Sequence, residues 1–171
     1  KLMAAAPEDL REVPEVHIRP MMEMDLPEVA GIEAKSYAFP WSENIFRDCL
    51  RVGYTCRALD LAGQIIGYGV MSLGAGEAHI LNLCVREEFR IVGFGRRLLE
   101  HMLERAAASG IGEAFLEVRL SNLAAIRLYQ RLGFEQIGIR RGYHQAPRGA
   151  RRRHRAEAQS SASLNSPTEI S

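Results

Sequence analysis

The short stretch Arg90-Ile91-Val92-Gly93-Phe94-Gly95 has the composition of a loop that binds an anion. It follows an apolar run over residues 79–85 and precedes a run of helical periodicity, which predicts a strand, a loop and a helix N-terminus. The two glycines let the backbone approach a ligand without a Cβ in the way. The first N–H groups of a helix have no partner within it, and with the helix dipole they favour a phosphate. We call this stretch the candidate phosphate cradle.

The cradle fits neither of two common nucleotide-binding loops. No Gly-Lys-Ser/Thr follows it, as a P-loop requires, and it lacks the third glycine and the first-strand position of a dinucleotide fingerprint. Two glycines in a loop are also typical of an ordinary turn. Whether the cradle binds an anion or is an ordinary turn therefore depends on the rest of the chain.

Length and composition indicate one globular domain with a substantial core. The chain has 171 residues, of which 47% are hydrophobic and 25% charged. No apolar run approaches the length of a membrane span, and the first residues do not have the layout of a signal peptide. Cys49, Cys56 and Cys84 form no CxxC pair and leave an odd thiol, which favours a reducing cytoplasm.

Positive charge is concentrated near the end of the chain. Residues 148–171 hold five arginines against two glutamates, a balance of +3, so residues 1–147 carry −2 of the net charge of +1. We therefore expect no specific nucleic-acid surface on the globular part. We predict a flexible leader over residues 1–14, one domain over 15–147, and a basic, then serine-rich tail of disordered composition over 148–171.

Hydrophobic periodicity and turn signals predict the element order β-α-α-β-β-β-α-β-α-β. The predicted strands cover residues 16–19, 54–59, 64–73, 77–85, 114–118 and 134–140. The predicted helices cover residues 25–36, the run after Ser42, the run from the cradle to a C-terminal Gly110, and the run capped by Asn122. Because hairpins join several strands, we expect an α/β (α+β) fold with a mixed sheet.

The first two predicted helices carry recognisable start signals. Asp25, with Glu28 three residues later, predicts a capping box. Ser42 predicts the N-cap of the second helix, with Trp41 and Phe46 at the positions of a hydrophobic staple.

Three segments together resemble one family. His79-Ile80-Leu81-Asn82-Leu83-Cys84-Val85 resembles the strand whose backbone pairs with the pantetheine arm of acetyl-coenzyme A, and the cradle resembles the pyrophosphate-binding motif that follows it. Residues 116–134 resemble the signature LEVR-x-SN-x-x-A-x-x-LY-x-x-x-GF. On these motifs residues 16–147 resemble the GCN5-related N-acetyltransferases (GNAT family).

Two further segments narrow the resemblance. Phe39-Pro40-Trp41-Ser42-Glu43 and Arg140-Arg141-Gly142-Tyr143 are similar to the RimI-type ribosomal-protein alanine N-acetyltransferases. The resemblance implies a GNAT fold, a mixed central sheet of about six to seven strands flanked by about four helices. It also implies acetyl-CoA as co-substrate, with no metal. The implied cofactor-binding residues are Leu83, Cys84, Val85, Ile91, Val92, Gly93, Phe94, Gly95, Arg96 and Asn122.

The resemblance implies direct attack of an amine on the acetyl thioester, with Glu117 as base and Tyr129 as acid. An α-amine has a pKa of about 7.7–8.0, so a modest base suffices, and the thiolate that leaves needs a proton donor. From the residues alone, two other roles stay open. Glu117 can be an ion-pair partner of Arg119, and Tyr129 can be a core aromatic of its helix.

Three other residues also have plainer alternatives. Asn122 can be only a helix cap, and His79 only a surface or packing residue. Cys84 as an acetylated nucleophile would need an activating His or Asp, and no such residue lies near it in sequence.

The chain departs from the family at two places. Ile91 and Val92 stand where relatives commonly carry arginine, so we expect weaker cofactor binding unless Arg90, Arg96 or Arg97 supplies the charge. After Pro147 the family continues into a last strand, whereas this sequence shows no strand pattern. A frameshift in the coding sequence would explain that change, and a genuine basic tail for contact with RNA is the alternative.

The acceptor side is defined more loosely. Phe39, Trp41 and Tyr143 can frame a peptide N-terminus, although Trp41 can equally serve only in the staple. The resemblance implies as acceptor and partner the N-terminal alanine of a small-subunit ribosomal protein, in the cytoplasm and away from membranes. Two alternatives are an acetyltransferase for a small amine, such as a polyamine or antibiotic, and a non-catalytic acyl-CoA-binding protein.

Overall fold

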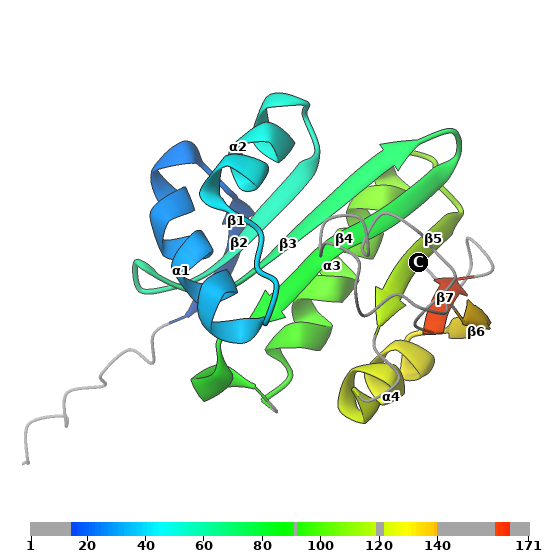
Figure 1. The fold of residues 1–171 in the computed structure, drawn as a ribbon. Coiled ribbons are helices and arrows are strands. Elements are labelled where there is room, and N and C mark those ends of the chain that lie inside the picture. The colour runs from blue at the N-terminus through cyan, green and yellow to red at the C-terminus, as the bar shows by residue number, and fades with distance from the viewer. Residues whose placement is uncertain (1–14, 91, 119–121, 140–159, 165–171) are drawn as a thin grey trace, which may run out of the picture.

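The computed structural model describes residues 15–90, 92–118, 122–139 and 160–164. In this part of the chain a single sheet is packed between helices (Figure 1). The strands are β1 (Val16–Pro20), β2 (Thr55–Leu61), β3 (Gln64–Gly74), β4 (Glu77–Val85), β5 (Glu113–Val118), β6 (Phe134–Ile139) and β7 (Ser160–Leu164). The helices are α1 (Leu26–Ser36), α2 (Glu43–Arg51), α3 (Phe94–Ala108) and α4 (Leu123–Arg131), with short 3-10 turns η1 (Glu23–Asp25) and η2 (Glu87–Phe89).

The sheet has seven strands in the order β1-β2-β3-β4-β5-β7-β6. Its first four strands are antiparallel neighbours, β4 and β5 are parallel, and β7 is antiparallel to both of its neighbours. The mixed sheet of six to seven strands and the four α-helices of the described residues confirm the predicted fold class.

Strand β7 is not predicted from the sequence. It lies within the tail, where the sequence pattern indicates no strand, and that expectation is wrong for Ser160–Leu164. The segment pairs with β5 on one side and with β6 on the other. Its residues have little strand propensity, so its conformation follows from two flanking ladders rather than from its own sequence.

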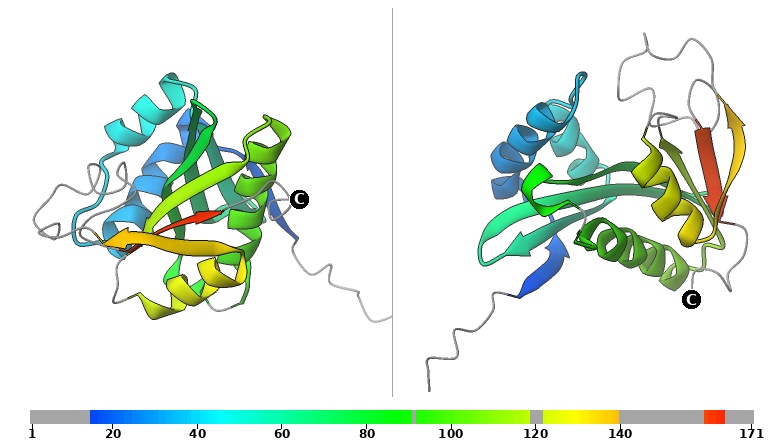
Figure 2. Two further views of the ribbon diagram at one scale, coloured as in Figure 1. Left: turned by 90° about the vertical axis from the view of Figure 1, so that its right-hand side faces the viewer. Right: turned by 90° about the horizontal axis from the view of Figure 1, so that it is seen from below.

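The helices cover both faces of the sheet (Figure 2). On one face α1 and α2 pack a core that includes Leu26, Phe46, Tyr68 and Leu81. On the other face α3 and α4 pack against β4, β5 and β6 around Leu99 and other apolar side chains. The strands at the centre of the sheet are therefore buried on both sides.

The predicted ends of α2 and α3 are confirmed. The Ser42 hydroxyl accepts a hydrogen bond from the backbone N–H of Ile45, and the rings of Trp41 and Phe46 pack edge to face with centroids 5.3 Å apart. At the end of α3 the φ of Gly110 is +77°, and its N–H donates to the carbonyl of Ala107. This is the C-terminal geometry for which glycine is favoured.

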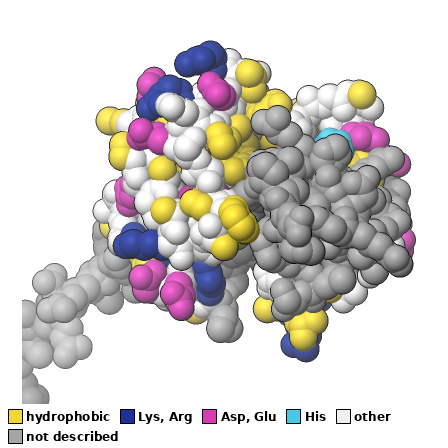
Figure 3. Space-filling view, in the orientation of Figure 1, with side chains coloured by type: hydrophobic (Ala, Val, Ile, Leu, Met, Phe, Trp, Pro, Cys, Tyr) yellow, Lys and Arg dark blue, Asp and Glu magenta, His cyan; other side chains and the backbone are white. Residues whose placement is uncertain are grey.

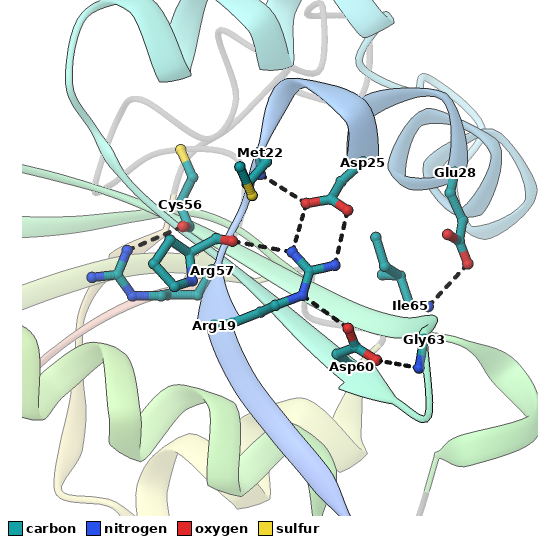
Figure 4. A network of polar contacts seen from close by, with 10 residues as sticks. Arg19, Met22, Asp25, Glu28, Cys56, Arg57, Asp60, Gly63 and Ile65 are labelled. Atoms are coloured by element: carbon teal, nitrogen blue, oxygen red, sulfur yellow. Dashed lines mark hydrogen bonds and ion pairs between the residues drawn. The ribbon is translucent and has the colours of Figure 1, made fainter.

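The predicted capping box of α1 is wrong. The Asp25 side chain makes no cap bond to the helix; instead it accepts from the backbone N–H of Met22 and pairs with Arg19. Glu28 accepts from the backbone N–H of Ile65 at 2.9 Å. Figure 4 shows both groups pointing away from the start of α1, toward β1 and β3. Because Asp25 binds an arginine and Glu28 binds a strand N–H, neither carboxylate caps the helix.

Candidate active site

Strands β4 and β5 separate after a short parallel ladder. Their pairing runs from Glu77–Glu113 to Ile80–Leu116, yet β4 continues to Val85. A bulge in the β3–β4 ladder falls at this point, since Val70 pairs with Asn82 and Met71 with Ile80. The last residues of β4 therefore have β3 as a neighbour on one side but no strand ladder with β5 on the other.

The backbone of Leu83 and Val85 points to the side of β4 away from β3. The N–H of Arg86 donates to the carbonyl of Ile66, which fixes the alternation of this antiparallel pair. By that alternation the backbone N–H and carbonyl of Cys84 point toward β3, and those of Leu83 and Val85 point away from it. Side chains reach the exposed carbonyls: the Tyr37 hydroxyl donates to Leu83 at 3.1 Å and Arg90 Nε to Val85 at 2.9 Å. This main-chain edge is where the resemblance predicts the pantetheine arm.

The predicted cradle joins this edge to the start of α3. The φ of Gly93 is +87°, a conformation that favours glycine, and α3 begins at Phe94. Within the described residues, no group accepts from the N–H groups of Phe94, Gly95 and Arg96. The geometry is therefore that of a helix N-terminus with free donors, which can hold an anion.

The other cradle residues differ in exposure and packing. Val92 is 66% exposed, Phe94 packs beside Phe89, and Ile91 lies outside the described residues. A Cβ on Gly95 would lie 3.8 Å from Leu128 and 3.9 Å from Val85, so Gly95 stands between β4 and α4.

The arginines around the cradle also form hydrogen bonds within the protein. Arg96 Nε donates to Glu100 and Arg97 to the carbonyl of Val16, while Arg90 holds Val85 as described above. A guanidinium has five N–H donors, so each retains donors beyond the one used here. Their charge therefore remains close to the cradle while part of each side chain is fixed.

Glu117 lies on the face of β5 that is turned toward α1 and α2. Its neighbours Leu116 and Val118 belong to the core on the α3 side, so alternation places Glu117 on the opposite face. The side chain is half-buried and its Oε1 is buried. Phe115, on the same face, stacks on His79, and His79 pairs with Glu77 at 2.9 Å.

Tyr129 and Asn122 lie on α4, on the opposite side of the sheet. Tyr129 is half-buried, packs against the core on the α3 side, and lies 6.0 Å from Phe134 between ring centroids. The Asn122 side chain accepts from the N–H of Ala125 at 3.2 Å, as an N-cap does. Glu117 and Tyr129 thus flank β5 from opposite faces. Arg119, the possible ion-pair partner of Glu117, lies outside the described residues.

A buried carboxylate that sequence reasoning missed lies beside the site. Glu33 of α1 is fully buried and accepts three hydrogen bonds, at 2.8 Å from the Tyr68 hydroxyl and at 2.9 Å from Asn82 Nδ2 and the backbone N–H of Trp41. Burial raises the pKa of Tyr68 well above its usual value, so its hydroxyl stays a donor. A sequence signal existed: Glu33 stands on the apolar face of α1 with Val29 and Ile32.

The α1–α2 loop, residues 37–42, carries two of the three predicted acceptor-binding residues. Phe39 is 53% exposed, whereas Trp41 is 3% exposed and lies in the core, which supports the staple alternative for Trp41. On the face shown in Figure 3, hydrophobic side chains gather over α1, α2 and this loop. Tyr143 lies outside the described residues.

Cys84 is buried, and its Sγ lies 3.9 Å from the carbonyl of Val85, so the structure gives it a packing role. Over the residues that the structure describes, no group of three or more His, Cys, Asp or Glu side chains is placed to hold a metal ion. None of the described helices is both long and apolar enough to cross a membrane.

The chain is similar in sequence to known proteins. The model of the acetyltransferase (GNAT) family matches residues 18–134. The [ribosomal protein bS18]-alanine N-acetyltransferase of Escherichia coli K12 is 38% identical over 120 residues, which is 70% of this chain and 81% of the relative. Its counterpart in Salmonella typhimurium is 37% identical over 125 residues, 73% of this chain and 84% of the relative.

A solved structure extends the likeness to the fold. The crystal structure of the ribosomal-protein-S18-alanine N-acetyltransferase from Escherichia coli superposes with a TM-score of 0.74 at 30% identity, covering 88% of this chain and 95% of that one. The family model spans the predicted cradle, Glu117 and Tyr129. The chain therefore belongs to the GNAT family of acetyl-CoA-dependent N-acetyltransferases.

Proposed function

We propose that this enzyme transfers the acetyl group of acetyl-CoA to the N-terminal α-amine of a protein, namely the N-terminal alanine of a small-subunit ribosomal protein. The observation that carries the proposal is the end of the β4–β5 ladder at Ile80–Leu116, next to Glu117 and the open main-chain edge of Leu83 and Val85. Relatives named for alanine acetylation of ribosomal protein bS18 support the choice of acceptor. The reaction then belongs in the cytoplasm, where ribosomal proteins are made.

The co-substrate would be held by backbone more than by side chains. The N–H groups of Leu83 and Val85, and the second lone pairs of their carbonyls, which already accept from Tyr37 and Arg90, suit the amides of a pantetheine arm. The free N–H groups at the start of α3 suit its pyrophosphate. Because these donors belong to the backbone, Ile91 and Val92 remove only the side-chain share of anion binding. Asn122 would contribute from the cap of α4, and acetyl-CoA supplies the reactive thioester.

Glu117 is proposed to remove the proton from the acceptor amine, directly or through one water. The neutral amine nitrogen forms a bond to the acetyl carbon as this proton leaves, and the carbon–sulfur bond breaks. Tyr129 donates its hydroxyl proton to the departing sulfur. The placement of Glu117 and Tyr129 on opposite faces of β5 supports this division, since the amine approaches the acetyl carbon from one side and the sulfur departs on another.

Thiol release from acetyl-CoA, measured with a panel of acceptors, tests the proposal. The panel holds short peptides that begin with alanine, serine, methionine or an acetylated alanine, together with spermidine. We expect saturable turnover on the alanine peptide and none on its acetylated form. Turnover on spermidine alone would instead assign a small amine as acceptor. Binding of acetyl-CoA without turnover on any acceptor would favour a binding protein.

A further inference from the structure

Glu33 ties the α1–α2 loop to the strand that carries the open edge. One carboxylate oxygen, Oε2, accepts from the backbone N–H of Trp41 in the loop, and the other, Oε1, accepts from Asn82 on β4 and Tyr68 on β3. All four residues are at least 97% buried. A buried carboxylate with three donors is strongly held, because losing any donor leaves charge uncompensated in a dry environment.

Two hydrogen-bonded connections join the α1–α2 loop to β4 beside the site. Asn82 precedes Leu83, whose carbonyl accepts from Tyr37, so the first and the fifth residue of the loop are each connected to adjacent positions of β4. These positions lie just beyond the last β4–β5 pair, and the Asn82 side chain points toward α1, on the Glu117 side of the sheet. The loop segment between the two ties contains Phe39, which is exposed.

We propose that Glu33 is a positioning residue for the acceptor: it fixes the α1–α2 loop against β4 and thereby sets where the acceptor N-terminus enters beside Glu117. This inference rests on the proposed function, and it goes further because Glu33 touches neither substrate. Holding the loop in place before binding removes the ordering cost that the acceptor would otherwise meet.

The substitution Glu33→Gln breaks one tie selectively. Glutamine keeps a single acceptor oxygen, which can still serve Tyr68 and Asn82, and it then places an NH2 group against the N–H of Trp41. Glu28→Gln is the control, since Glu28 lies on the same helix and also accepts from a backbone N–H, that of Ile65 on β3. The control changes the same functional group without touching the loop.

Trp41 is the only tryptophan of the chain, so its fluorescence reports directly on the loop. For Glu33→Gln we expect a red shift of the native emission and a rise of about tenfold to a hundredfold in KM for the alanine peptide. The KM for acetyl-CoA and the emission of Glu28→Gln should remain unchanged. Unchanged emission and peptide KM in Glu33→Gln would overturn the proposal, as would an equal rise in both KM values.

Two further results keep the test decisive. If Glu33→Gln does not fold, Asn82→Ala removes the hydrogen bond that links Glu33 to β4, and unchanged Trp41 emission and peptide KM in that variant overturn the proposal. If the wild-type protein acetylates no peptide, the proposed function fails on its own. The emission of Glu33→Gln relative to Glu28→Gln then still decides whether Glu33 holds the loop.

Discussion

The guanidinium of Arg19 and the carboxylate of Asp25 form a two-pronged ion pair, with Nη1–Oδ2 and Nη2–Oδ1 distances of 2.7 and 2.9 Å. The same arginine donates through Nε to Asp60 at 2.8 Å. Figure 4 shows Arg19 lying between the two acids, so that β1, the turn before α1 and β2 are joined through one cation. This arrangement lowers the pKa of Asp25 and of Asp60 below their usual value.

The ion pairs of Asp25 and Asp60 with Arg19 should make the stability of the protein fall at low pH. Because both carboxyl pKa values are lower in the folded chain, their contribution is present above about pH 4 and is lost as pH falls through the folded values. We expect Asp25→Asn to reduce the free energy of unfolding by roughly 1–3 kcal/mol at pH 7, from the loss of charge-assisted hydrogen bonds. Urea unfolding at several pH values measures this.

The difference between wild type and Asp25→Asn should shrink as the pH falls below about 4, because the unfolded chain takes up protons there and the folded acids follow at lower pH. Asp48→Asn is a suitable control, because its pair with Arg51 is largely exposed and contributes little. A difference that stays constant from pH 7 to pH 3 would show that the bonds to Asp25 do not depend on its charge.

Glu117→Gln should separate catalysis from binding. The variant keeps the size and burial of the side chain but cannot accept the amine proton, so kcat should fall by about 10²–10⁴-fold. The dissociation constant of acetyl-CoA, measured by calorimetry, should stay within a factor of two or so. A wild-type rate in this variant would remove Glu117 from the mechanism and leave it an ion-pair role.

Tyr129→Phe should lower kcat while preserving the core. The ring that packs near Phe134 is retained, so the melting temperature should change little, whereas the proton for the departing sulfur is lost. The test pairs turnover with a melting curve. If turnover is unaffected, the hydroxyl of Tyr129 is not the acid, and water or another group protonates the thiolate.

Gly93→Ala should weaken acetyl-CoA binding. Its φ of +87° is unfavourable for alanine, which costs about 1–2 kcal/mol and shifts the N–H groups at the start of α3. Gly53→Ala is matched, since Gly53 has a φ of +82° and both positions have open space where a Cβ would be placed. Both variants should lose similar stability, and only Gly93→Ala should raise the KM for acetyl-CoA. Equal KM values in the two variants would argue against the cradle.

Local signals in the sequence predicted the elements well. Ser42 with Trp41 and Phe46, Gly110 and Asn122 each act within one turn of a helix, so their types and spacing suffice to place the ends of α2, α3 and α4. The strand Glu77–Val85 and the helix that begins after the loop were likewise predictable, because their pattern is continuous along the chain.

Contacts between segments that are far apart in the sequence could not be predicted. Asp25 and Glu28 have ideal spacing for a capping box, yet each binds a group that the chain brings close only after folding, Arg19 for one and the backbone of Ile65 for the other. The partners of Glu33 could not be predicted either, because its donors come from a loop and two strands. The roles of Glu117 and Tyr129 came from family resemblance, since periodicity places them only on a strand and a helix.

The last described strand has a consequence for how the protein is made. Strand β7 lies inside the sheet, between β5 and β6, although every other described element precedes it in the chain. During synthesis β5, which carries Glu117, therefore remains without this neighbour until residues 160–164 have left the ribosome. The sheet is therefore completed only after this segment has been synthesised, so the enzyme would become active only once residues 160–164 have emerged.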